Sequence, residues 1–272
     1  MSEFCFKNFS LPLGKKTYIM GILNVTPDSF SDGGKNYNKK DAIAAALKMA
    51  EAGADIIDIG AQSTRPGHVP VSPKEEYRRL EGVLERVIKL TGLPVSVDTY
   101  YPEVAGFALE AGCHIINDIS GVVNLKTAEL VKKHDAGWIL MHNGEEQTEN
   151  IAKTVHDRLC DMLEKAVDFG IKSDHICLDP GIGFGKTMQQ NAALIMNTGI
   201  VRVKNIAYLL GASRKRIIGA ALDPAILPQD RDWGTVAAHT IGILGRADIL
   251  RVHNCEAAVQ AARVADYLMR NS

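Results

Sequence analysis

The sequence contains no long apolar run and carries almost no net charge, and each absence excludes a class of protein. No apolar run approaches the roughly 20 residues needed to span a bilayer. The 31 basic and 32 acidic side chains give a formal net charge of −1. Proteins that bind nucleic acids usually have a basic excess. Any site for an anion must therefore be local.

Cysteine pairs and a secretion signal are also missing. The five cysteines form no C-x-x-C pair, and an odd count at irregular spacing is typical of reduced thiols rather than a disulfide framework. The N-terminus lacks the basic start and apolar segment of a signal peptide. We therefore expect a cytoplasmic protein.

The remaining composition is that of an ordinary globular protein, with 272 residues of which 46% are hydrophobic and 23% charged. This length permits one large domain or two ordinary ones. No linker rich in Ser or Gly interrupts the chain, so we expect a single domain over residues 1–272. Residues 1–16 form an N-terminal extension in this interpretation, arranged as a β-hairpin over one end of the domain.

Hydrophobic periodicity predicts an alternating order of strands and helices. The expected strands cover residues 18–23, 56–60, 94–97, 114–116, 138–141, 176–178, 207–210 and 248–252. The expected helices cover residues 41–52, 75–90, 102–111, 125–134, 151–169, 189–203, 233–244 and 256–269. Strict alternation indicates a parallel α/β sheet, and eight units in about 250 residues favour a (β/α)₈ TIM barrel. A doubly wound open sheet is the alternative.

Polar side chains follow nearly every predicted strand. They are Asn24, the loop from Gly60 to Arg65, Asp98, Asn117, His142, Asp179, the run from Ser213 to Lys215, and Arg251 with His253. In a barrel of parallel strands, the carboxyl ends of all strands meet at one face. The sequence therefore predicts a polar site at that face.

The residue types divide this site into two parts. One part suits a heteroaromatic ring with an amidine edge, because a carboxylate accepts two parallel N–H bonds; its members are Asp98, Asn117, Asp179 and Lys215. The other suits a phosphate-bearing group with Mg²⁺, for which an amide oxygen is a suitable ligand; its members are Asn24, Thr64, Arg65, Arg251 and His253.

Structural roles compete with these interpretations. Asp98 and Asp179 could instead cap turns, and Asn117 with Asp118 could form an Asx turn. For Arg251 we favour a functional role over a structural one, because an unpaired guanidinium inside a strand is costly. We expect His142 to support other residues rather than to act as a catalyst.

The segment 180–187, PGIGFGKT, is one residue short of the phosphate-binding loop G-x-x-x-x-G-K-[ST], since Pro180 replaces the first glycine. We therefore do not predict a nucleotide triphosphatase. The glycines are expected to let the backbone approach a ligand or a neighbouring loop.

Seven segments resemble the dihydropteroate synthase family of pterin-binding TIM barrels. They are NVTPDSFSDGG (24–34), STRPG (63–67), SVDT (96–99), IND (116–118), LDPGIGFGKT (178–187), SRK (213–215) and RVH (251–253). They occur in chain order and cover essentially the whole sequence. The resemblance implies a transferase of folate biosynthesis that joins 4-aminobenzoate to (7,8-dihydropterin-6-yl)methyl diphosphate with Mg²⁺, releasing diphosphate by an SN1-like displacement.

The resemblance also implies roles for individual residues. The pterin would be held by Asp98, Asn117, Asp179 and Lys215. The diphosphate would be held by Asn24, Thr64, Arg251 and His253, with Asn24 also the metal ligand. The 4-aminobenzoate pocket, which sulfonamides occupy, would be formed by Phe30, Thr64, Arg65, Pro66, Ser213 and Lys215. The catalytic set would be Asn24, Arg65, Lys215, Arg251 and His253, in a chain that acts as a homodimer.

Two positions depart from the family pattern: Gln62 stands where relatives often have Glu, and Asn254 stands where Asp is frequent. Two alternatives to an active synthase stay open at this point. One is a non-catalytic pterin-binding paralogue, and the other is a pterin-dependent methyltransferase. Against the paralogue weigh the intact residues Asn24, Arg65, Lys215, Arg251 and His253. The methyltransferase would need the pterin half of the site but not the segments 24–34 and 251–253, so their presence weighs against it.

Overall fold

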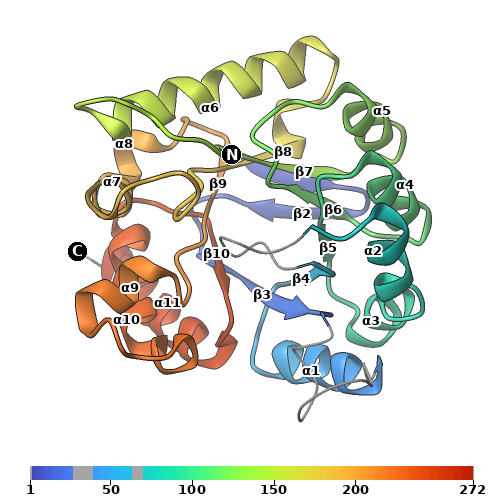
Figure 1. Cartoon of the computed structure of the whole chain (residues 1–272), viewed down its shortest axis with the longest axis horizontal. Helices are drawn as coiled ribbons and strands as arrows, with labels where there is room; N and C mark the ends of the chain where they lie inside the picture. The colour runs from blue at the N-terminus through green and yellow to red at the C-terminus, as the bar shows by residue number, and fades with distance from the viewer. Residues whose placement is uncertain (1, 27–38, 63–69, 272) are drawn as a thin grey trace.

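The barrel expected from the alternating pattern is present in a computed structural model, which describes residues 2–26, 39–62 and 70–271 (Figure 1). Eight parallel strands close in the order β10-β3-β4-β5-β6-β7-β8-β9. This confirms the (β/α)₈ prediction, and the open-sheet alternative is wrong. The barrel strands are β3 (Tyr18–Asn24), β4 (Ile56–Gly60), β5 (Val95–Asp98), β6 (Ile115–Asp118), β7 (Gly137–Met141), β8 (Ile176–Asp179), β9 (Ala207–Leu210) and β10 (Ile249–Val252).

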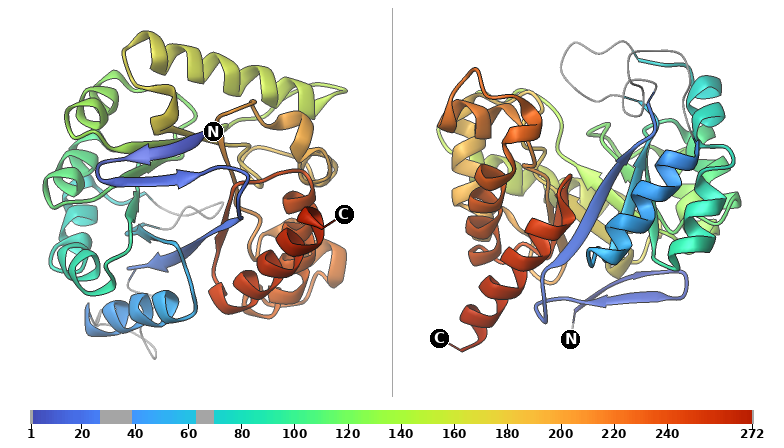
Figure 2. Two further views of the ribbon diagram at one scale, coloured as in Figure 1. Left: turned by 180° about the vertical axis from the view of Figure 1, so that it is seen from behind. Right: turned by 90° about the horizontal axis from the view of Figure 1, so that it is seen from below.

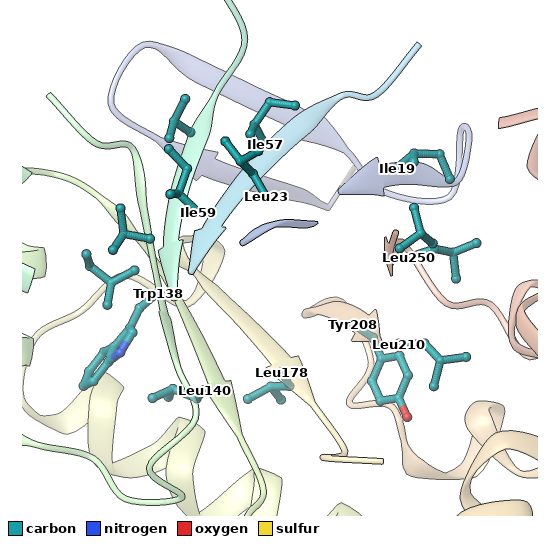
Figure 3. Packing of buried hydrophobic residues seen from close by; sticks show 14 of the residues in the cluster. Ile19, Leu23, Ile57, Ile59, Trp138, Leu140, Leu178, Tyr208, Leu210 and Leu250 are labelled. Atoms are coloured by element: carbon teal, nitrogen blue, oxygen red, sulfur yellow. The ribbon is translucent and has the colours of Figure 1, made fainter. Parts of the chain in front are cut away.

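The alternation of side chains along each strand separates two hydrophobic layers, because successive side chains point to opposite faces. Outward-facing residues such as Ile57, Ile59 and Leu140 pack against the surrounding helices (Figure 3). Inward-facing residues such as Met20, Ile56 and Ile139 fill the barrel in a second cluster. Helices and barrel interior thus bury both faces of the sheet, which explains the continuous apolar runs in the sequence.

The N-terminal extension forms the expected antiparallel hairpin, with strands β1 (Glu3–Phe6) and β2 (Phe9–Pro12). The hairpin lies across the end of the barrel where the strands begin (Figure 2). Phe4 and Phe6 are fully buried there, within the inward-facing cluster. A Cβ on Gly137, at the start of β7, would lie 2.9 Å from the Phe4 ring. The hairpin therefore closes this end and leaves the opposite end for the site.

The helices surround the barrel as predicted, with two corrections. The expected helix 75–90 is wrong as a single element, because Gly82 has a left-handed φ of 71° between α2 and α3. The expected helix 189–203 likewise divides at Asn197 into α7 and α8. The helices are α1 (Lys39–Glu51), α2 (Pro73–Leu80), α3 (Leu84–Thr91), α4 (Pro102–Glu110), α5 (Leu125–Lys133), α6 (Ile151–Asp168), α7 (Met188–Met196), α8 (Thr198–Val201), α9 (Arg216–Leu222), α10 (Asp232–Leu244) and α11 (Cys255–Arg270).

Helix α9 was not predicted from the sequence. In the described ranges, no helix is both long enough and apolar enough to cross a membrane. All five cysteines are free thiols, as expected from their spacing.

Candidate active site

The inward-facing positions of the strands change from apolar to polar toward the carboxyl ends. On β4, β5 and β6 the strand-end positions lie side by side in register, with Gly60 opposite Asp98 and Asp98 opposite Asn117. Asp179 ends β8, and Arg251 lies on β10. The barrel thus brings these predicted residues together, and all except half-buried Arg251 are buried.

Arg251 is the centre of an ion-pair network across the barrel. Its Nε donates to Asp58 Oδ2 at 2.6 Å, and its Nη2 donates to Asp98 Oδ2 at 2.7 Å. The amide of Asn117 donates to the same Asp58 oxygen at 3.2 Å. A buried guanidinium requires such partners. Arg251 is therefore positioned by two carboxylates at the base of the site.

Asp58 was missed by the sequence analysis, although a signal was present. It is the only charged residue in the strand IIDIG and is fully buried. A lone carboxylate in an apolar strand needs a buried cation, and Arg251 is the one strand residue that could supply it. The separation of 193 positions between the two gave no local pattern to recognise.

Three buried oxygen acceptors at the base of the site have no hydrogen-bond partner within the described part of the chain. They are Asp58 Oδ1, Asp98 Oδ1 and Asn117 Oδ1. Burial, with a further contribution from Asp58, raises the pKa of Asp98 to about 7, while Arg251 opposes the shift. Unpaired buried acceptors are costly, so this base suits a ligand that presents several N–H donors.

Asp179 and Lys215 form the second part of the site. Asp179 Oδ1 accepts a hydrogen bond from the backbone of Gly181 at 2.7 Å, so it caps a turn as well as facing the site. Lys215 Nζ donates to the carbonyl of Ile182 and lies 4.8 Å from the centroid of the Phe184 ring. Burial lowers the pKa of Lys215 to about 8, against the attraction of Asp179. The lysine is therefore a partly buried cation beside an aromatic face.

The glycine-rich segment 181–185 packs against a neighbouring loop, which confirms one of the two expectations for it. Gly181, Gly183 and Gly185 all have left-handed φ values, of 68°, 85° and 67°. A Cβ on Gly181 would lie 1.9 Å from the carbonyl oxygen of His142, and one on Gly185 would lie 2.4 Å from backbone carbon of Gly144. Only glycine allows this approach. The segment is a backbone contact rather than a phosphate loop.

Ser213 and His253 form a pair on adjacent strand ends. The Ser213 hydroxyl accepts from the backbone N–H of His253 at 3.2 Å and lies 2.9 Å from its Nδ1. Ser213 is buried, and His253 is partly exposed. The serine therefore fixes the orientation of the imidazole ring at the mouth of the barrel.

Asn24 ends β3 opposite Gly60. Its Oδ1 lies 3.5 Å from the position that a Cβ on Gly60 would occupy, and Asp98 Oδ2 lies 3.9 Å from the same point. The missing side chain of Gly60 thus leaves space between the two oxygen groups. The described ranges contain no cluster of three His, Cys, Asp or Glu side chains that could hold a metal ion.

Four predicted site residues lie outside the described residues: Phe30, Thr64, Arg65 and Pro66.

His142 behaves as expected for a supporting residue. Its Nε2 lies 3.3 Å from Glu146, and burial, with Lys186 nearby, lowers its pKa.

The two departures from the family pattern have local partners. Gln62 is buried, and its Oε1 accepts from the hydroxyl of Tyr100 at 3.4 Å. Asn254 caps α11 by accepting from the backbone of Ala257 at 3.1 Å, and its amide donates to Asp232 at 3.1 Å. Because Asp at position 254 could not donate to a carboxylate, the asparagine matches Asp232 in this chain.

Behind the site, the buried carboxyl group of Glu76 on α2 should make the stability of the protein depend on pH. It is fully buried, neither carboxyl oxygen has a hydrogen-bond partner in the described part of the chain, and burial raises its pKa to about 7. The folded state therefore holds the proton more tightly than the unfolded state, and stability falls as pH rises from about 4.5 toward 7. We expect Glu76→Gln to stabilise the protein at pH 8 by up to about 3 kcal/mol and to have little effect at pH 4.5.

Thermal unfolding of the wild type and the Glu76→Gln variant at the two pH values measures this difference. Glu75→Gln on the same helix is the control, because Glu75 is paired with Arg78 and Arg79 and its pKa is lowered to about 2. That change should not stabilise the protein at pH 8. An equal effect of Glu76→Gln at both pH values would contradict the prediction.

Comparison with known proteins agrees with this geometry. The family model described as "Pterin binding enzyme" matches residues 20–253. A dihydropteroate synthase of Clostridium beijerinckii is 43% identical over 95% of this chain and 96% of its own length. The solved dihydropteroate synthase of Clostridium difficile, determined in the presence of pteroic acid, has a TM-score of 0.90 and 41% identity, covering 96% of this chain and 99% of that one. The enzyme from Xanthomonas albilineans in complex with 7,8-dihydropteroate has a TM-score of 0.88 and 37% identity, covering 96% and 97%.

Fold and site together define a barrel enzyme whose strand ends carry buried acceptors suited to a small, donor-rich molecule. The chain belongs to the pterin binding enzyme family and, within it, to the dihydropteroate synthases.

Proposed function

We propose that this chain condenses (7,8-dihydropterin-6-yl)methyl diphosphate with 4-aminobenzoate, giving 7,8-dihydropteroate and diphosphate. The observation that carries the proposal is a set of three buried acceptors, Asp58 Oδ1, Asp98 Oδ1 and Asn117 Oδ1, that have no partner among the described residues. A pterin ring presents N–H donors from its amino group and ring nitrogens. Hydrogen bonds to a charged partner contribute roughly 1.5–3 kcal/mol each, so two or three fix such a ring firmly.

The residues in the barrel support a dissociative reaction. The bond between the pterin methylene carbon and the diphosphate oxygen breaks first, and the resulting cation is delocalised into the electron-rich ring. Asp98 and Asp179 supply negative charge next to that cation, and Arg251 and His253 face the departing anion. The amine nitrogen of 4-aminobenzoate then forms the new bond and releases a proton. The protein acts by charge and by positioning, so no covalent nucleophile is required.

We propose Mg²⁺ as the cofactor, held by Asn24. Gly60 has no side chain, and the space this leaves lies next to the Asn24 oxygen, where an ion can bind. The hard amide oxygen is a suitable ligand for Mg²⁺. Mg²⁺ commonly takes only one or two protein oxygens and fills its remaining positions with phosphate and water. When bound, it neutralises charge on the leaving diphosphate.

We assign the second substrate to the space beside Ser213 and Lys215, together with Phe30, Thr64, Arg65 and Pro66 of the two long loops. The partly buried ammonium of Lys215 over the Phe184 ring is an environment suited to an aromatic acid. A solved relative from Yersinia pestis is described with a sulfonamide drug complex. Sulfonamides resemble 4-aminobenzoate, and we propose that they occupy the same space here.

Diphosphate release tests the function directly. With Mg²⁺ and 4-aminobenzoate both present, the purified protein should release diphosphate from the pterin substrate and form dihydropteroate in equal amount. Binding of the pterin without any release would favour the non-catalytic paralogue. Methyl transfer from methyltetrahydrofolate would favour the methyltransferase.

We also propose a cytoplasmic homodimer. The groove between α10 and α11, of about 600 Å³, has apolar side chains along it, and Trp233 and Leu268 in its wall are 80% and 60% exposed. Exposed apolar patches of this kind mark interaction sites. We expect a mass in solution of twice the 29.5 kDa of one chain, and Trp233→Glu should yield monomers. A wild type that stays monomeric at micromolar concentration would contradict the dimer.

A further inference from the structure

Helix α10 presents a stripe of three polar residues to the β9–α9 loop, residues 211–215. The stripe consists of Asp232, Thr235 and His239, which lie on one face of the helix because they are three and four positions apart. Thr235 and His239 are buried, and Asp232 is partly exposed. None of the three belongs to the predicted site.

Every member of the stripe bonds to the loop. His239 Nε2 accepts from the backbone N–H of Ala212 at 3.1 Å. Thr235 Oγ1 accepts from the backbone N–H of Arg214 at 3.0 Å. Asp232 accepts two parallel bonds from the Arg214 guanidinium, at 2.7 and 2.8 Å. Backbone and side chain of the loop are therefore held by a single helix.

The loop needs this support because Arg214 has a left-handed backbone, with φ of 58°. Residues other than glycine persist in that conformation only where the surroundings impose it. Arg231, just before the helix, adds a bond from its Nη1 to the Arg214 carbonyl at 3.2 Å. This backbone conformation directs the Arg214 side chain toward α10 and away from the site. The side chains of its two neighbours, Ser213 and Lys215, are directed toward the site.

The stripe also reaches the β10–α11 loop. Asp232 Oδ2 accepts from the Asn254 amide at 3.1 Å, and Asn254 directly follows His253. Asp232 is thus bonded to both loops that supply the Ser213–His253 pair. The Arg214 guanidinium and the Asn254 amide supply the positive charge and donor that keep this carboxylate ionised.

We propose that α10 is the positioning element of the site, with Asp232 as its central residue. By holding the β9–α9 and β10–α11 loops together, α10 sets the positions of Ser213, Lys215 and His253. The proposal rests on the proposed function for its kinetic consequence only. Asp232, Thr235 and His239 are positioning residues, since they act through the loops.

The test compares Asp232→Asn with Arg202→Gln. The control removes a partly buried ion pair of the same kind, Arg202 with Asp248 at 3.5 Å, located where strand β10 begins. For Asp232→Asn we expect about a tenfold rise in the KM for 4-aminobenzoate, with a smaller change in calorimetric affinity for the pterin without phosphates. Binding of that phosphate-free ring depends mainly on Asp98, Asn117 and Asp179, which the stripe does not touch. For Arg202→Gln we expect lower thermal stability and unchanged KM values.

A second readout does not depend on activity. Hydrogen exchange of the Ala212 and Arg214 amides should be faster in Asp232→Asn than in the wild type and in Arg202→Gln. Unchanged exchange in this loop, or an equal loss of affinity for 4-aminobenzoate and for the pterin without phosphates, would overturn the proposal. A wild type that releases no diphosphate would overturn the proposed function instead, and the exchange measurement would still decide the role of α10.

Discussion

Arg251→Ala is expected to destabilise the protein by about 3–5 kcal/mol and to reduce its activity by at least about a hundredfold. The reason is the network inside the barrel, where Arg251 donates to Asp58 at 2.6 Å and to Asp98 at 2.7 Å. Removal of the guanidinium leaves two buried carboxylates close together without a cation. Chemical unfolding and the diphosphate assay measure the two losses.

The pH dependence separates this cause from simple loss of packing. In the variant, Asp98 loses the cation that opposes the rise in its pKa. The folded state then binds more protons than the unfolded state, and stability falls as pH rises. The destabilisation should therefore shrink at pH 5. Adding Asp58→Asn to Arg251→Ala should recover stability without recovering activity. A destabilisation that does not change with pH would contradict this account.

Binding measurements with the same variant test whether Arg251 acts on the diphosphate. We expect Arg251→Ala to weaken binding of the pterin diphosphate far more than binding of the same pterin without phosphates. An equal loss for both would show that Arg251 acts only through Asp58 and Asp98, by keeping these two carboxylates in place for the pterin.

Gly181→Ala is expected to have the second large effect, a fall in melting temperature of about 10 °C, which corresponds to several kcal/mol in a chain of this size. The added Cβ would lie 1.9 Å from the carbonyl oxygen of His142, which is backbone and cannot rotate away. The turn would have to shift, and the hydrogen bond from Gly181 N–H to Asp179 would be lost. Pterin binding should fall with it, because Asp179 loses its fixed position.

Gly183→Ala is the matched control in the same segment. Its φ of 85° is also left-handed, so the cost of conformation is similar, roughly 1–2 kcal/mol. However, its added Cβ would meet only the flexible side chain of Lys215, at 3.3 Å. We expect a fall of a few degrees in melting temperature and a change in activity through Lys215. Equal melting temperatures for the two variants would show that the contact with His142 is unimportant.

Local patterns in the sequence were sufficient to predict the architecture. The apolar runs and their alternation with helical segments predicted all eight strands to within about two residues. The polar residues after the strands predicted Asp98, Asn117, Asp179, Ser213 and Lys215 as neighbours. These predictions work because parallel strands that close into a barrel bring their carboxyl ends to one face, whatever the details of packing.

Breaks within helices were harder to predict. Both the helix 75–90 and the helix 189–203 have continuous amphipathic patterns in the sequence, yet each is divided in the structure. Gly82 is compatible with a helix interior at a modest cost, so its left-handed φ depends on how α2 and α3 pack. The packing of α2 and α3 against the barrel therefore decides that the helix breaks at Gly82.

By itself, the sequence determined the fold class and the family, and it predicted which polar residues lie together at the strand ends, since these follow from periodicity and from motifs at strand ends. Only the tertiary structure decided which charges are paired. It joined Asp58 and Asp98 to Arg251 across the barrel, and it placed Asp232 against Arg214 and Asn254. These pairs connect positions up to 193 residues apart. Their physical origin is the closure of the barrel, which makes a buried cation and distant carboxylates neighbours and requires them to neutralise one another.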